Sequence, residues 1–167
     1  YIISSIDWKN AARRGIDWRS GNQWRAAMSA ADNKKLMETI FAGVAAGDRT
    51  SYVDALADDV TMTVTGQYSW SQTFHGKESV LRDLYGYVAS LVKQRRSVPF
   101  RMIADDEWVV VEARGDMETH AGERYDNHYC LIYRIENGKI REIREYQDST
   151  LCERVLGPFP KARKLAG

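Results

Sequence analysis

Residues 125–150, YDNHYCLIYRIENGKIREIREYQDST, predict two β-strands joined by a tight turn. The run from Asn127 to Ile135 alternates aromatic or aliphatic residues with polar or smaller ones, which is the pattern of a half-buried strand. Asn137-Gly138 is a strong hairpin signal, because both central residues of such a turn must tolerate φ > 0. The run from Lys139 to Gln147 supplies the second strand, so we expect an antiparallel hairpin.

Strand periodicity assigns the side chains of this hairpin to two faces, because alternate residues point to the same side. Asn127 and Tyr129 share one face of the first strand. In the second strand Ile143 and Glu145 share a face, and Arg144 lies on the other. Each strand therefore presents one set of side chains to the interior and one to the outside.

Three segments carry a resemblance to a known family: Tyr125-Asp126-Asn127-His128-Tyr129, Gly138-Lys139-Ile140 and Arg144-Glu145-Tyr146-Gln147-Asp148. In this order they resemble the C-terminal hairpin of SnoaL-like proteins, in the ketosteroid isomerase-related branch of the NTF2-like superfamily. The resemblance covers roughly residues 30–155. It implies an α+β cone, in which a curved antiparallel sheet wraps on about three N-terminal helices, and a SnoaL-like domain over residues 29–156.

The segments upstream of the hairpin agree with this order of elements. Residues 29–46 predict a helix with Ser29 or Asp32 as its N-cap, because these side chains accept bonds from free backbone N–H groups. Tyr52–Leu56 predicts a second, short helix, and residues 77–93 predict a third.

Four strands in series follow the third predicted helix. Arg95-Arg96 is interpreted as the solvated end of that helix, where positive charge suits the helix dipole. Val98–Ile103 and Trp108–Thr119 then precede the two hairpin strands, and a further strand, Val60–Gly66, lies earlier in the chain. Short turns between consecutive strands predict an antiparallel meander.

Length, charge and cysteine content limit the class of protein. The 167 residues suit one domain, and 44% hydrophobic with 28% charged residues indicate a globular chain. A net charge of +1 argues against a nucleic-acid partner. No apolar run is as long as a membrane span and nothing at the start resembles a signal peptide. Cys130 lies in a predicted strand, so a reduced thiol and a cytoplasmic location are favoured over a disulfide.

Residues 1–28 form a predicted N-terminal extension, in which Ile6-Asp7-Trp8-Lys9 recurs as Ile16-Asp17-Trp18-Arg19. One interpretation is a helical segment that packs its tryptophans on the body or on a second subunit. The others are a basic aromatic arm that contacts an acidic partner or a membrane surface, and residues upstream of a natural start at Met28. Residues 157–167 predict an irregular tail on the surface.

The strand Trp108–Thr119 has one apolar row and one charged row, and the charged row contains Arg114 and Asp116. One interpretation is an ordinary solvent face. The other follows from a resemblance to limonene epoxide hydrolase of the same superfamily, whose catalytic Arg-x-Asp and last-strand Asp carry over onto Arg114, Asp116 and Glu145. Under it, Asn127, Tyr129 and Ile143 lie at the same cavity, and Thr63 and Thr65 stand where that enzyme has Tyr and Asn.

This interpretation predicts acid–base chemistry on a small, mostly apolar organic substrate. Burial raises the pKa of a carboxylate and a nearby arginine lowers it, so Glu145 is expected to be the base and Asp116 the acid, with Arg114 holding both. The resemblance implies an isomerase, cyclase or epoxide hydrolase without a cofactor. The alternative is a non-catalytic module for ligand binding or dimerisation.

Two further expectations concern metals and assembly. The histidines His75, His120 and His128 lack metal-ligand spacing, so no metal site is expected. The outer face of the hairpin carries His128, Arg144 and Tyr146. Because members of the superfamily pair sheet to sheet, the resemblance implies a homodimer through this face.

Overall fold

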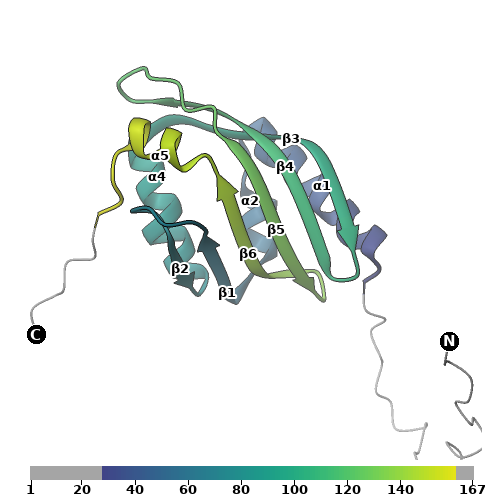
Figure 1. Cartoon of the computed structure of the whole chain (residues 1–167). Coiled ribbons are helices and arrows are strands. Elements are labelled where there is room, and N and C mark those ends of the chain that lie inside the picture. Colours follow the sequence, from purple (N-terminus) through teal and green to yellow (C-terminus); the bar gives the residue numbers. More distant parts are fainter. Residues whose placement is uncertain (1–27, 161–167) are drawn as a thin grey trace, which may run out of the picture.

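The computed structural model describes residues 28–160, so residues 1–27 of the predicted extension and residues 161–167 of the predicted tail lie outside it. Helices packed on a six-stranded sheet confirm the predicted α+β class. The helical elements are α1 (Ala30–Ala46), α2 (Thr50–Ala55), α3 (Lys77–Ser79), the π-helix η2 (Val80–Gly86), α4 (Tyr87–Leu91) and α5 (Ser149–Leu156). Figure 1 shows a curved sheet with α1 and α2 behind it and α4 and α5 toward one end.

The sheet has the strand order β2-β1-β6-β5-β4-β3. Its strands are β1 (Leu56–Val64), β2 (Gln72–His75), β3 (Val92–Asp105), β4 (Trp108–Thr119), β5 (His128–Glu136) and β6 (Lys139–Gln147). The meander β3 to β6 is antiparallel as predicted, but β1 runs parallel to β6. The predicted antiparallel pairing therefore holds for β1 with β2 and for β3 to β6, and the β1–β6 pair makes the sheet mixed. A parallel pair needs a long crossover, and the chain from β2 to β5 supplies it.

Local signals account for the boundaries of α1. Ser29 and Asp32 form a capping box, in which each side chain accepts a bond from the other's backbone N–H, and Gly47 ends the helix at φ 87°. Met37 and Phe41 are among the side chains that α1 buries against the sheet. The predicted helix over residues 29–46 is thus confirmed.

The third predicted helix is a continuous helical segment over residues 77–91, but its middle is π-helical. Strand β3 begins directly after it at Val92. The interpretation of Arg95-Arg96 as a solvated helix end is therefore wrong. Arg96 forms an ion pair with Asp116 on the outer face, whereas Arg95 lies toward the interior and donates a bond to the Tyr85 carbonyl oxygen.

The hairpin β5–β6 forms as predicted. Asn137 and Gly138 have φ of 52° and 74°, which is the left-handed conformation that this turn requires. Leu131 pairs with Glu145 and Tyr133 with Ile143, so the inward faces of the two strands coincide. This register places Glu145 toward the helices.

The chain after β6 is more ordered than its sequence indicates. Asp148 caps α5 by accepting a bond from the Leu151 N–H at 3.0 Å. Beyond this helix, the Phe159 ring packs on Trp70, with ring centroids 4.8 Å apart. Phe159 therefore belongs to the body of the domain, although the sequence predicts an irregular surface tail there. No helix in the described part of the chain is long and apolar enough to cross a membrane.

Candidate functional site

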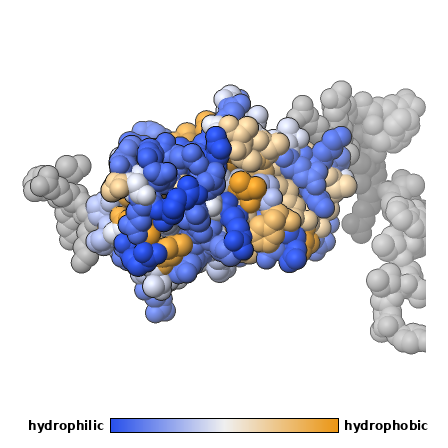
Figure 2. All heavy atoms as spheres, turned by 90° about the horizontal axis from the view of Figure 1, so that it is seen from above, coloured by the Kyte–Doolittle hydropathy of each residue, from blue (hydrophilic) through white to orange (hydrophobic). Residues whose placement is uncertain are grey.

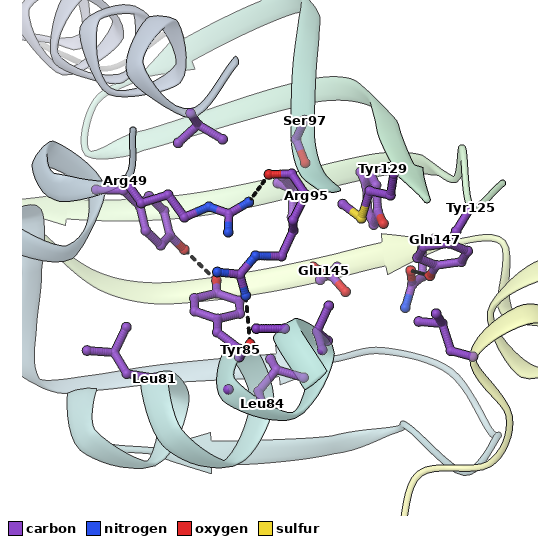
Figure 3. Close-up of a pocket in the computed structure, with 18 of the residues that line it drawn as sticks. Arg49, Leu81, Leu84, Tyr85, Arg95, Ser97, Tyr125, Tyr129, Glu145 and Gln147 are labelled. Carbon is purple, nitrogen blue, oxygen red and sulfur yellow. Dashed lines mark hydrogen bonds between the residues drawn. The ribbon is translucent and has the colours of Figure 1, made fainter. Parts of the chain in front are cut away.

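A cavity of about 330 Å³ lies between the helices and the inward face of the sheet. This volume is within the range of small-molecule sites, about 300–1,000 Å³. Helices α1, α2, η2, α4 and α5 and strands β3 to β6 all contribute to its wall, which is mainly apolar. Figure 3 shows this cavity. Its larger polar lining residues are Arg49, Tyr52, Tyr85, Arg95, Tyr125, Tyr129, Tyr133, Glu145 and Gln147.

Glu145 brings a carboxylate into the cavity from β6. Within residues 28–160 its carboxylate has no hydrogen bond or ion pair. Its backbone carbonyl oxygen accepts bonds from the Thr65 N–H at 2.9 Å and from Thr65 Oγ1 at 2.8 Å. Burial raises the pKa of Glu145 from its ordinary 4.5 to about 7. A carboxylate with such a pKa can both accept and return a proton near neutral pH.

Several tyrosines line the same cavity as Glu145. Burial, and secondarily the charge of Glu145, raises the pKa of Tyr129 well above its ordinary value, and burial raises the pKa of Tyr52 to about 12. The Tyr52 and Tyr85 hydroxyl oxygens are 2.6 Å apart, and the Tyr85 hydroxyl donates to Met62 Sδ at 3.1 Å. A thioether is a weak acceptor, so the Tyr85 proton is available to a ligand oxygen.

Arg49 and Arg95 also line the cavity, and the sequence interpretation missed both. Arg95 lies on the inward side of β3, where the register shifts between Val92 and Gln94. This irregularity breaks the period of two, so alternation along the sequence does not indicate which way Arg95 points. Arg49 lies between α1 and α2, where no periodic signal exists.

Gln147 connects the cavity to a buried polar network. Its Oε1 accepts bonds from the Tyr125 hydroxyl at 2.8 Å and from Asn127 Nδ2 at 3.1 Å, and its Nε2 donates to the Tyr68 hydroxyl at 2.8 Å. Asn127 is fully buried and also bonds the Asp148 backbone N–H and carbonyl. Asn127 therefore holds the end of β6 in place and does not line the cavity, contrary to its predicted position.

The structure does not form the predicted group of Arg114, Asp116 and Glu145. On β4 the apolar row faces inward, so the charged row that contains Arg114 and Asp116 faces outward. Arg114 is exposed, and Asp116 accepts a bond from Arg124 at 2.6 Å, which lowers the pKa of Asp116. The alternative interpretation of this row, as a solvent face, describes it correctly.

Besides Asn127, three more of the five predicted binding residues lie away from the cavity wall, so only Tyr129 of the five lines it. The Thr63 hydroxyl is 2.9 Å from that of Thr73 on β2, and the Thr65 hydroxyl bonds the Glu145 backbone. Ile143 is fully buried in the core. Met62 and Val64 are fully buried or nearly so on the inward face of β1. Because successive residues of a strand point to opposite faces, the neighbouring threonines do not share the inward face. Tyr129 lines the cavity beside Glu145.

Metal ligation has no visible basis in the part of the chain that the structure covers. There, no group of three or more His, Cys, Asp or Glu side chains could hold a metal ion. The arrangement instead offers one isolated carboxylate, several neutral tyrosine donors and two arginines in a mainly apolar space. This combination suits proton transfer to and from an organic ligand.

Comparisons with known proteins agree on the fold. A family described as SnoaL-like domain matches residues 37–143. An NTF2-like protein of unknown function from Burkholderia pseudomallei K96243 is 22% identical, with a TM-score of 0.66 over 77% of this chain and 98% of that chain. TerC, co-crystallised with polyporic acid, is 16% identical, with a TM-score of 0.64 over 74% of this chain and 97% of that one.

A protein from Jannaschia sp. CCS1, provisionally named a SnoaL-like polyketide cyclase, is 13% identical, with a TM-score of 0.63 over 77% of this chain and 93% of that one. No functionally curated protein matches the chain. At these identities the solved structures establish the fold alone. The predicted NTF2-like fold is thereby confirmed.

Proposed function

The chain belongs to the SnoaL-like domain family, and we propose that it is an enzyme that moves a proton on a small, largely apolar organic substrate. Glu145 is the general base. The observation that carries this proposal is the Glu145 carboxylate, which faces the cavity without a partner in residues 28–160 and whose pKa burial raises to about 7. A structural carboxylate would be expected to have a counterion or hydrogen-bond donors.

The reaction begins at a carbon next to a carbonyl group. Glu145 takes a proton from this carbon, the C–H electron pair forms the enolate, and the negative charge moves to the carbonyl oxygen. The Tyr85 or Tyr129 hydroxyl donates a hydrogen bond to that oxygen. In an isomerase, Glu145 then returns the proton at another carbon. In a cyclase, the enolate carbon attacks a second carbonyl, and Glu145 gives its proton to the new alkoxide.

The environment of Glu145 favours these two reactions over epoxide hydrolysis. Hydrolysis by the predicted route needs Asp116 as the acid and Arg114 between the carboxylates, and both lie on the outer face. Proton transfer at carbon needs only the base and an oxyanion donor. Two structural neighbours, one provisionally named a polyketide cyclase and one co-crystallised with polyporic acid, support a ring compound as the substrate.

Deuterium exchange tests the proposal with simple ketones in place of the natural substrate. The protein is incubated in deuterium oxide with cyclic ketones such as 2-tetralone and 3-cyclohexenone, and exchange at carbon is followed by NMR. We expect wild type to accelerate exchange, and Glu145→Gln to lose about 10²–10⁴-fold of this rate, the usual contribution of a general base.

Glu142→Gln is the matched control, because Glu142 lies on the same strand but faces outward, where it pairs with Arg144. This variant should keep the full exchange rate. Equal exchange in wild type and Glu145→Gln would contradict the proposal and would favour a non-catalytic ligand-binding module.

A further inference from the structure

Two arginine side chains reach into the cavity without a carboxylate partner. Within residues 28–160 most arginines form an ion pair with Asp or Glu, whereas Arg49 and Arg95 form none. Their hydrogen bonds in this part of the chain go to backbone oxygens. Arg49 donates to the carbonyl of Arg95, and Arg95 donates to the carbonyl of Tyr85 at 2.6 Å. Each guanidinium retains further N–H donors.

Burying the positive charges of Arg49 and Arg95 costs free energy. Both side chains are half-buried, and burial lowers the pKa of Arg49. A backbone carbonyl satisfies an N–H group, but it does not neutralise a positive charge. Arg114 also forms no ion pair within the described residues, but it is exposed to water. The cavity arginines therefore leave a positive charge that a bound anion would neutralise.

We propose that Arg49 and Arg95 form an anion-binding subsite, and that the substrate is an apolar ring compound that carries a carboxylate. This inference rests on the proposed function, because it names the substrate class of the same cavity. The planar guanidinium group matches a carboxylate with paired N–H···O bonds. The aromatic and aliphatic wall of the cavity receives the ring system.

The subsite lies apart from the proposed base. In Figure 3, Arg49 and Arg95 lie beside Tyr85, and Glu145 lies between Arg95 and Gln147. Neither arginine forms an ion pair with Glu145. A carboxylate at the arginines thus places the ring of the substrate toward Glu145. The negative charges of substrate and base stay at different positions in the cavity.

A pair of probes with nearly the same shape and different charge tests the subsite. The affinities of the full-length protein for 2-naphthoate and 2-naphthamide are measured by calorimetry. Wild type should bind naphthoate at least about tenfold more tightly, since a hydrogen-bonded charge contributes more than about 1.4 kcal/mol. Arg49→Met and Arg95→Met should lose this preference, and Arg95→Lys should keep part of it. Arg114→Met, which removes an exposed arginine, should keep all of it.

Two results would overturn the subsite. One is equal affinity of wild type for naphthoate and naphthamide, and the other is an unchanged preference in both methionine variants. Arg95→Met loses its bond to the Tyr85 carbonyl and could fail to fold. In that event two measurements test the subsite: the naphthoate preference of Arg49→Met and the effect of added salt on wild type. Salt should weaken naphthoate binding and leave naphthamide binding unchanged. A preference that withstands both would count against the subsite.

The binding and exchange assays separate this inference from the proposed function. Glu145→Gln should bind naphthoate at least as tightly as wild type, because it removes a negative charge from the cavity. Loss of the naphthoate preference with intact exchange would contradict the subsite alone. An intact preference without any exchange that depends on Glu145 would contradict the proposed chemistry alone.

Discussion

At the scale of single residues, Glu145 differs from the outward-facing carboxylates of the sheet in its charge partners. Outward-facing carboxylates such as Asp116 and Glu142 have arginine neighbours. Glu145 faces inward on the same sheet, lines the cavity, and forms no ion pair within residues 28–160. The difference arises from the alternation of the strands, which sends neighbouring acidic residues into opposite environments. Its environment, rather than its residue type, makes Glu145 a candidate base.

The raised pKa of Glu145 predicts how stability depends on pH. Between pH 4.5 and about 7 the folded protein keeps a proton on Glu145 that the unfolded chain releases. The free energy of unfolding should therefore fall as pH rises through this window, by about 2–3 kcal/mol from this residue. Glu145→Gln cannot ionise, so it should gain stability relative to wild type over the same range.

Urea unfolding of both proteins from about pH 4.5 to about 8 measures this difference. Carboxylates with lowered pKa, such as Asp32 and Asp116, titrate at lower pH and are common to both proteins. A constant stability difference across the range would mean that Glu145 is solvated in the folded state.

At the scale of elements, the junction of β4, β5 and β6 depends on a close backbone approach. A Cβ atom at Gly115 would lie 3.1 Å from both the Asn127 nitrogen and the Tyr125 oxygen. Asn127 in turn bonds Gln147 and Asp148, at the end of β6 and the start of α5. Glycine at this position therefore lets three elements meet beside the cavity.

Gly115→Ala should destabilise the domain because backbone atoms cannot yield as a flexible side chain can. We expect a loss of about 1–3 kcal/mol, as for other overpacked positions. The melting temperature should then fall by several degrees, measured by circular dichroism. A melting temperature equal to that of wild type would show that the strands can separate locally at no cost.

At the scale of the whole molecule, the outer face of the sheet points to self-association. Val98, Phe100 and Ile103 on β3 and Tyr146 on β6 are 45%, 60%, 58% and 45% exposed, so four large apolar side chains of the sheet remain in contact with water. Figure 2 shows a mainly hydrophilic surface with apolar residues gathered in part of it. Exposed large apolar side chains of this kind are typical of a protein–protein interface.

We expect a homodimer in which each subunit buries about 800 Å² of this face. Phe100→Asp should convert the dimer to a monomer, because a charge in the interface would lose its water without a partner. Ser90→Asp on α4, an exposed position among the helices, should leave the dimer intact. Light scattering at micromolar concentration measures both, and a monomeric wild type would refute the expectation.

Local patterns in the sequence determined the elements and the fold class. The capping box of α1, the Asn137-Gly138 turn and the period of two in β4 to β6 each depend on residues close together in the chain. The bounds of β4 and β6 agree with the predicted ones. The same periodicity separated the charged row of β4 from its apolar row. It also grouped Glu145 with the residues that face inward.

The tertiary structure alone decided which polar residues meet. The parallel pairing of β1 with β6 depends on contacts between distant segments. A register shift in β3 turned Arg95 inward and brought it to Arg49, although no local pattern relates them. The pKa of Glu145 likewise follows from burial by residues of many elements. Desolvation and charge pairing depend on which groups lie close together in the folded protein, so the order of residues along the chain does not reveal them.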